Sequence, residues 1–238
     1  MAFDLYSGTF TRYYRREWEN CVERMSRESG MEYRRIYAGG EPGTPAPAEE
    51  IREGVGHWRR AMNEALGTNL TGPISWDEGD GQPYFSDRPA WDGYSAVLLW
   101  AAYAACPEMT RPTHLPSRWA DDLAYQKATG KESEAPFPNI LVASMWLPGN
   151  FDFVFTFPTL VSKDAQPIGS TFALRAELDA LMAKTAAELD AAPPIGEETD
   201  QPDEEVVTLV QMARFGLGIF REMAEWACKH HLPLLTDF

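Results

Sequence analysis

An apolar run of about 13 residues, Tyr94 to Cys106, constrains the fold more than any other feature of the sequence. It is bounded by Asp92 and Pro107, and it is well short of the roughly 20 apolar residues that a transmembrane helix needs. We therefore expect a core helix from about Trp91 to Cys106, which Pro107 stops.

Five further helices are predicted from apolar positions at helical spacing and from capping residues. Gly67 stands where a C-cap is expected, and Ser117 and Ser170 are the expected N-caps. The predicted ranges are 16–29, 48–66, 117–129, 170–189 and 203–231. Because Gly216 and Gly218 lower the helix propensity of the last range, we expect another element to pack closely against it there.

Strands are predicted where apolar, β-prone residues form short runs between turn residues. Residues 139–146 and 151–157 are two such runs joined by the turn-rich segment 147–150, which indicates a β-hairpin. The second run has phenylalanine at every other position, so one of its faces must be buried against helices. Residues 3–9, residues 32–37 and the final LPLLTDF are the other predicted strands. The expected fold class is α+β, with about six helices packed with a small, mainly antiparallel sheet.

The length of 238 residues favours a single compact α+β domain over residues 1–238. A loop or linker at 38–48 and an acidic loop at 188–205 are the expected irregular segments. A chain of this length buries roughly 70–75% of its extended surface, so its core needs no disulfides. The three cysteines are widely spaced, and the first ten residues lack the pattern of a signal peptide, which predicts reduced thiols and a cytoplasmic protein.

Charge is distributed unevenly along the chain. Residues 1–60 hold ten Arg, no Lys and ten Asp or Glu, which leaves 11 basic and 26 acidic residues, and the whole net charge of −15, in residues 61–238. A surface of this kind repels phosphate backbones and anionic lipid, so the sequence argues against nucleic-acid and membrane partners. It favours a basic protein partner instead.

No motif of catalysis or cofactor binding is present. The Gly-rich pieces AGGEPG and DEGDGQ match neither a P-loop nor a dinucleotide-binding loop, and there is no GxSxG or HExxH sequence. We therefore predict no cofactor and no metal site. An EF-hand beginning at Asp77 fails because Arg88 occupies the twelfth position, where a bidentate glutamate is needed.

The aromatic and acidic loop that runs into the core helix, ISWDEGDGQPYFSDRPAWDGY (residues 74–94), is the best candidate site. Its carboxylates, mixed with Trp76 and Tyr84, are typical of the anchors and rim of a protein interface, although core packing explains these two aromatic residues equally well. For Trp91 and Tyr94, at the start of the core helix, core packing is favoured. The predicted partner-binding residues are Trp76, Asp77, Glu78, Asp80, Tyr84, Asp87, Glu197, Glu198 and Asp200.

The stretches WDEGDGQPYFSDRPAWDGYSAVLLWAAYA and WLPGNFDFVFTF, followed by the IGS that opens a predicted helix, resemble segments of uncharacterised bacterial proteins. Some of these are similar to immunity proteins of polymorphic toxin systems, many of which are acidic because they cover the basic active sites of their toxins. The resemblance supplies no motif from which a functional residue can be transferred, and it implies only an acidic cytosolic α+β protein with a basic partner.

Two functions are expected from these observations. The first is a non-catalytic, acidic binding protein that neutralises a basic protein partner such as a bacterial toxin. The alternative is a small hydrolase or metal-dependent enzyme that uses Asp77, Asp80, Asp87 and Asp92, because clustered carboxylates can bind a divalent cation or share acid and base roles.

Overall fold

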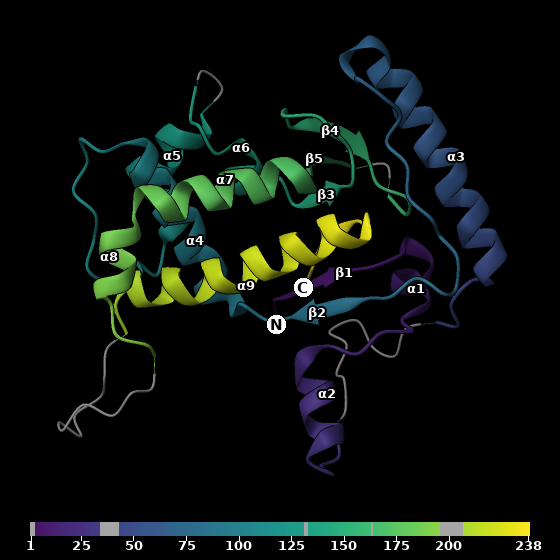
Figure 1. Ribbon diagram of the computed structural model, residues 1–238, viewed down its shortest axis with the longest axis horizontal. Coiled ribbons are helices and arrows are strands. Elements are labelled where there is room, and N and C mark those ends of the chain that lie inside the picture. The colour runs from purple at the N-terminus through teal and green to yellow at the C-terminus, as the bar shows by residue number, and fades with distance from the viewer. Residues whose placement is uncertain (1–2, 34–42, 131–132, 163, 196–206) are drawn as a thin grey trace.

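The computed structural model describes residues 3–33, 43–130, 133–162, 164–195 and 207–238. Over these residues the fold is α+β, with nine α-helices and one six-stranded mixed sheet, in agreement with the predicted class (Figure 1). The helices are α1 (Phe10–Arg15), α2 (Cys21–Glu28), α3 (Ala48–Leu66), α4 (Ala90–Ala105), α5 (Leu123–Thr129), α6 (Pro138–Leu141), α7 (Thr171–Lys184), α8 (Ala186–Ala191) and α9 (Leu209–His230). Short 3-10 turns lie at Gly67–Asn69 and Trp119–Asp121.

The sheet has the strand order β2-β1-β6-β3-β5-β4. Its strands are β1 (Asp4–Ser7), β2 (Phe85–Asp87), β3 (Met145–Leu147), β4 (Phe155–Pro158), β5 (Ala165–Ser170) and β6 (Leu234–Asp237). Only β3 and β5 pair in parallel, and the other pairs are antiparallel. The strand β6 therefore joins the N-terminal pair to the three strands from the middle of the chain.

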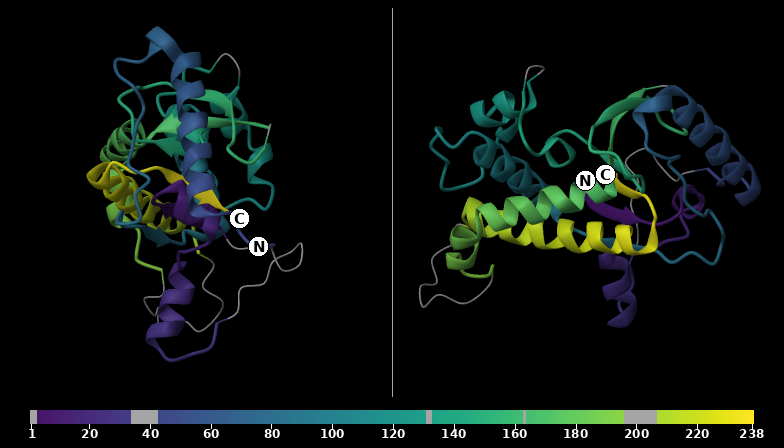
Figure 2. Two further views of the ribbon diagram at one scale, coloured as in Figure 1. Left: turned by 90° about the vertical axis from the view of Figure 1, so that its right-hand side faces the viewer. Right: turned by 45° about the horizontal axis from the view of Figure 1, so that its top comes forward.

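Both faces of the sheet are covered. Because side chains alternate along a strand, Leu5 and Trp146 face one side while Tyr6 and Leu147 face the other. The first side packs against α4, α7 and α9, and the second packs against α1 and α3. Figures 1 and 2 show α7 and α9 running side by side, with α3 apart from them on the other side of the sheet.

The core helix is confirmed. α4 begins at Ala90, one residue before the predicted start, and every residue from Ser95 to Ala104 is buried. It packs closely on α9 because Gly216 faces the backbone of Gly93, where an added Cβ would lie 2.5 Å from the Gly93 carbonyl oxygen. Close packing was predicted from Gly216, and it is confirmed at that position. No described helix combines the length and apolar character needed to cross a membrane.

Other predictions are confirmed at the level of single elements. The helix predicted at 48–66 is α3 with the same bounds, and the final strand is β6. The Ser170 hydroxyl caps α7 by accepting hydrogen bonds from the backbone N–H groups of Phe172 and Ala173. The alternating phenylalanines Phe151, Phe153, Phe155 and Phe157 all join the core on the α3 side of the sheet.

The predicted hairpin at 139–157 is wrong. Residues 138–141 form the short helix α6, and β5, which was not predicted, lies between β3 and β4. The Glu177 carboxylate explains the helix, because it accepts hydrogen bonds from the first backbone N–H groups of α6, at 3.1 Å from Asn139 and 3.0 Å from Ile140.

Three predicted helix boundaries are also wrong. The helix predicted at 16–29 is the shorter α2, which begins at Cys21, because Arg16 is the left-handed C-cap (φ 58°) that ends α1 and Asn20 forms a capping box with Glu23 at the start of α2. α5 is capped by Asp122 instead of Ser117. The range 170–189 breaks at Thr185 into α7 and α8.

Several predicted segments fall wholly or partly outside the described residues. Residues 34–37 of the second predicted strand are among them, and residues 32 and 33 are not in a strand. Of the predicted loop 38–48, residues 43–47 are irregular and residue 48 begins α3. The predicted acidic loop 188–205 is helical in α8 up to Ala191, and its residues 196–205 are not described.

Candidate functional site

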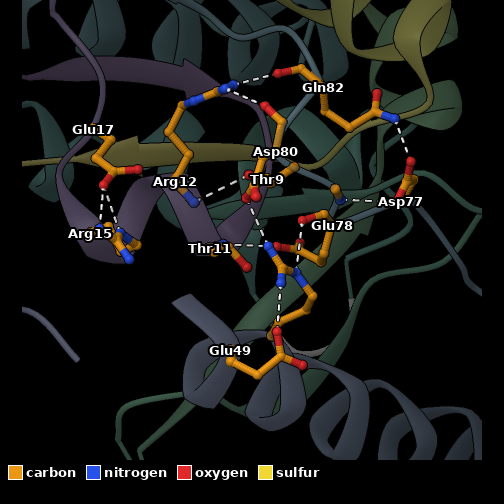
Figure 3. Close-up of polar contacts among 12 residues, drawn as sticks. Thr9, Thr11, Arg12, Arg15, Glu17, Glu49, Asp77, Glu78, Asp80 and Gln82 are labelled. Atoms are coloured by element: carbon orange, nitrogen blue, oxygen red, sulfur yellow. Dashed lines mark hydrogen bonds and ion pairs between the residues drawn. The ribbon is translucent and has the colours of Figure 1, made fainter. Parts of the chain in front are cut away.

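The buried part of the aromatic and acidic loop holds the start of α1 in place, and we call this part the clamp. Trp76 and Glu78 are only 6% and 7% exposed. The Glu78 carboxylate accepts hydrogen bonds from the backbone N–H groups of Phe10 (3.0 Å) and Thr11 (2.8 Å) and from the Trp76 indole. Glu78 thus binds the start of α1 to this loop (Figure 3). Trp76 and Glu78, predicted to bind a partner, are therefore core residues, because the first N–H groups of α1 require a buried acceptor.

The exposed carboxylates of the loop are satisfied locally. Asp77 accepts hydrogen bonds from the Gly79 backbone N–H (2.9 Å) and the Gln82 side chain (2.6 Å), and these bonds hold its pKa below the ordinary value. Asp80 forms an ion pair with Arg52 at 2.7 Å. Asp77 and Asp80 remain on the surface, but part of the negative charge of this loop is compensated within the protein.

The other residues predicted for this site lie apart from the clamp. Tyr84 is half-buried, and its hydroxyl accepts a hydrogen bond of 3.3 Å from the backbone N–H of Glu19. Asp87 lies on the edge strand β2, where it accepts from the Arg88 backbone N–H at 2.8 Å. Glu197, Glu198 and Asp200 lie outside the described residues.

The carboxylates of the alternative enzyme hypothesis do not converge on an ion site. Asp77 and Asp80 belong to one loop, Asp87 to β2 and Asp92 to the first turn of α4. Within the described ranges, no group of three or more His, Cys, Asp or Glu side chains is placed to hold a metal ion.

A groove runs along the outer side of α9 among the described residues. It has a volume of about 660 Å³, and we call it the α9 groove. It is lined by the start of α4, the segment after α8 and one side of α9, namely Pro89, Ala90, Asp92, Pro193, Pro194, Ile195, Val207, Gln211, Met212, Arg214, Phe215, Gly218, Ile219 and Glu222. Phe215 and Ile195 are 44% and 43% exposed over it. The groove thus presents large apolar side chains to solvent.

Two backbone features shape the α9 groove. Gly218 lies inside α9, yet beyond the helix's own backbone no atom of the described residues lies within 4 Å of the place where its Cβ would stand. The prediction of close packing is therefore wrong for Gly218, and the missing side chain leaves open space in the groove. Ala90, at the start of α4, has a φ of 56°, in the left-handed region that favours glycine. Such strained residues tend to cluster at functional sites.

A second hollow, of about 560 Å³, adjoins the α9 groove. We call it the tryptophan chamber, because Trp91 and Trp119 are its large aromatic residues. Asp92, Val207 and Met212 line both hollows. The two hollows therefore share one wall.

Free carboxylates stand at these hollows. Asp92 and Glu222 are exposed, and neither forms an ion pair or a side-chain hydrogen bond with another described residue. The one arginine of the groove, Arg214, donates a hydrogen bond to the Ala192 carbonyl. Among the described residues that line it, the groove thus carries two unpaired negative charges and one arginine that is held against the backbone.

Sequence reasoning missed this groove. Phe215 and Ile219 were part of a predicted helix, and nothing in the sequence separates an exposed apolar face of that helix from a buried one. The available signal was Gly218, since a glycine in a helix interior costs about 1 kcal/mol relative to alanine and needs a reason.

Comparisons with known proteins returned no relative. No protein-family model matches the chain, and neither the curated proteins nor the solved structures contain a significant match.

Proposed function

We propose that this protein is a non-catalytic binding protein that takes a segment of a basic protein partner into the α9 groove. The observation that carries the proposal is the groove, which combines exposed Phe215 with the unpaired carboxylates of Asp92 and Glu222. Exposed aromatic side chains in a hollow are typical anchors of protein interfaces, and large exposed apolar patches mark interaction sites.

Charge decides the kind of partner. The whole net charge of −15 lies in residues 61–238, which include every residue of the groove. The chain between the groove residues Ile195 and Val207 holds six carboxylates and no basic residue. A positively charged partner gains both faster association and better complementarity against such a surface. The exposed carboxylates of Asp77 and Asp80 add to the same field.

We further propose a bacterial toxin as this partner, so that the protein acts as an immunity protein. The support is the resemblance of its acidic and aromatic stretches to proteins of that kind. The proposed location is the bacterial cytoplasm, which suits the three free thiols of Cys21, Cys106 and Cys228.

The test is co-purification from the organism that encodes the protein, across a series of salt concentrations. We expect a basic protein to be recovered at low ionic strength and lost as salt rises, because salt screens exposed charges. Changing Phe215→Ser should reduce recovery about tenfold or more, as loss of a central aromatic anchor does.

Phe172→Ser is the matched control. Phe172 is 39% exposed, close to the 44% of Phe215, but it lies on α7 and does not line the groove. Equal loss of partner in both variants would place binding elsewhere than in the groove. Failure of the unaltered protein to recover any basic protein at low salt would overturn the proposed function.

A further inference from the structure

We infer that the tryptophan chamber binds the cationic side chain, arginine or lysine, of a partner segment whose neighbouring apolar side chain occupies the α9 groove. This inference rests on the proposed function and specifies the chemistry that the site selects. The protein would then recognise a basic residue next to an apolar residue in its partner, in addition to attracting the partner through its acidic surface.

The geometry links the two hollows through Asp92. This residue lines the α9 groove and the chamber alike, together with Val207 and Met212. Side chains at successive positions of a bound segment point in different directions, so one can enter each hollow while the backbone passes Asp92. The carboxylate then lies where it can neutralise a cation on the chamber side.

The two indole rings of the chamber are fixed by other aromatic residues. Trp91 contacts Phe3 with ring centroids 5.0 Å apart and Phe238 at 5.4 Å. Trp119 contacts Tyr125 at 5.1 Å. Both indoles are nevertheless only half-buried and line the hollow. Indole is the best aromatic partner for a cation, and a ring that is already fixed loses little entropy when it binds.

The charge balance of the chamber favours a cation over an anion or a neutral group. Among the described residues that line it, Asp92 is the acidic one and His114 is the basic one. His114 is directed to the backbone, with its Nδ1 3.4 Å from the Val207 carbonyl oxygen.

Asp92 also has an ordinary structural role, because an acidic residue in the first turn stabilises a helix through its dipole. That role requires no free space in front of the carboxylate and no aromatic rings beside it. The experiment must therefore separate an effect on α4 from an effect on a bound cation.

The probes are two synthetic peptides, acetyl-Phe-Arg-Leu-amide and its counterpart with citrulline in place of arginine. Citrulline keeps the shape of arginine and lacks its charge. Binding is followed by NMR, using the indole N–H signals of Trp91 and Trp119 for the chamber and the backbone N–H signals of Phe215 and Gly218 for the groove. We expect the arginine peptide to bind about five- to tenfold more tightly, from one cation–π contact and one ion pair.

Three variants complete the test. Asp92→Asn should abolish the preference for arginine, while Glu50→Gln, which removes a first-turn carboxylate from α3, should leave the preference unchanged. Gly218→Trp should fill the α9 groove and weaken both peptides alike.

The outcomes separate the two proposals. If both peptides shift the groove signals with equal affinity, or if Asp92→Asn keeps the preference for arginine, the inference is overturned and the proposed function stands. If neither peptide shifts the groove signals, or if Gly218→Trp changes nothing, the groove is not a binding site and both proposals fall.

Discussion

Gly216 and Gly218 lie two residues apart in α9, and the structure predicts opposite responses to the same substitution. A glycine in a helix interior is about 1 kcal/mol less favourable than alanine. Apart from the backbone of α9 itself, no atom of the described part of the chain lies within 4 Å of a Cβ added at Gly218, so Gly218→Ala should raise the free energy of unfolding by about 0.5–1 kcal/mol. For a chain of this length that gain corresponds to a rise of about 1–4 °C in Tm.

At Gly216 the same methyl group would lie 2.5 Å from the Gly93 carbonyl oxygen and 2.8 Å from Cγ2 of Val97. One of these contacts is with backbone, so α4 and α9 must move apart, at a typical cost of about 1–3 kcal/mol for an overpacked core. Since both variants gain the same helix propensity, the difference in stability between them equals this steric cost.

Urea denaturation followed by circular dichroism measures the two variants against the unaltered protein. The expected order of stability is Gly218→Ala, then the unaltered protein, then Gly216→Ala, or equality of the last two at the lower limit of the steric cost. If Gly216→Ala were as stable as Gly218→Ala, the close contact of α4 with α9 would be refuted. Destabilisation by Gly218→Ala would refute the open space that defines the groove.

Two further predictions concern buried carboxylates. Glu78→Gln should lower the free energy of unfolding by about 1–3 kcal/mol in the same urea assay, because hydrogen bonds to a charged group are lost at the start of α1. The control Asp80→Asn should change the free energy of unfolding by less than about 1 kcal/mol, as expected for an exposed ion pair. Equal effects of the two substitutions would contradict the role of Glu78 in holding α1. Burial raises the pKa of Glu177 above its ordinary value of 4.5, against the hydrogen bonds from Asn139 and Ile140 that lower it. The native state therefore holds this proton more tightly than the unfolded state, so stability relative to Glu177→Gln should fall as pH rises from about 4 through the raised pKa, and a difference that is constant with pH would contradict this assignment.

Local signals were enough to predict the long elements. α3 was predicted with its exact bounds because 19 residues carry one apolar face and Gly67 follows them. β5 was missed because its sequence AQPIGS contains a proline and a glycine and has no regular apolar alternation. α6 was taken for a strand because the carboxylate that accepts its first N–H groups belongs to Glu177, 37 residues further along the chain.

The site was less predictable than the fold for the same physical reason. That Glu78 is a cap for α1 depends on contacts across 67 and 68 residues, which composition and spacing do not contain. The α9 groove combines the start of α4 with the segment after α8, so it exists only once these segments are packed. The acidity of the second part of the chain was visible in the sequence, but the place where apolar surface remains open was not.

The position of β6 sets the order in which the molecule can be completed during synthesis. Leu235 pairs with Tyr6 on one side and with Met145 on the other, so β6 is the seam between the two parts of the sheet. A ribosome makes β1 first, yet the main partner of that strand emerges more than 220 residues later. Until then the apolar side of β1 and the near edge of β3 lack this neighbour. Contacts between residues so far apart in the sequence slow folding and leave unpaired strand edges that are prone to aggregate. We therefore expect the nascent chain to depend on chaperones until residue 237 has left the exit tunnel.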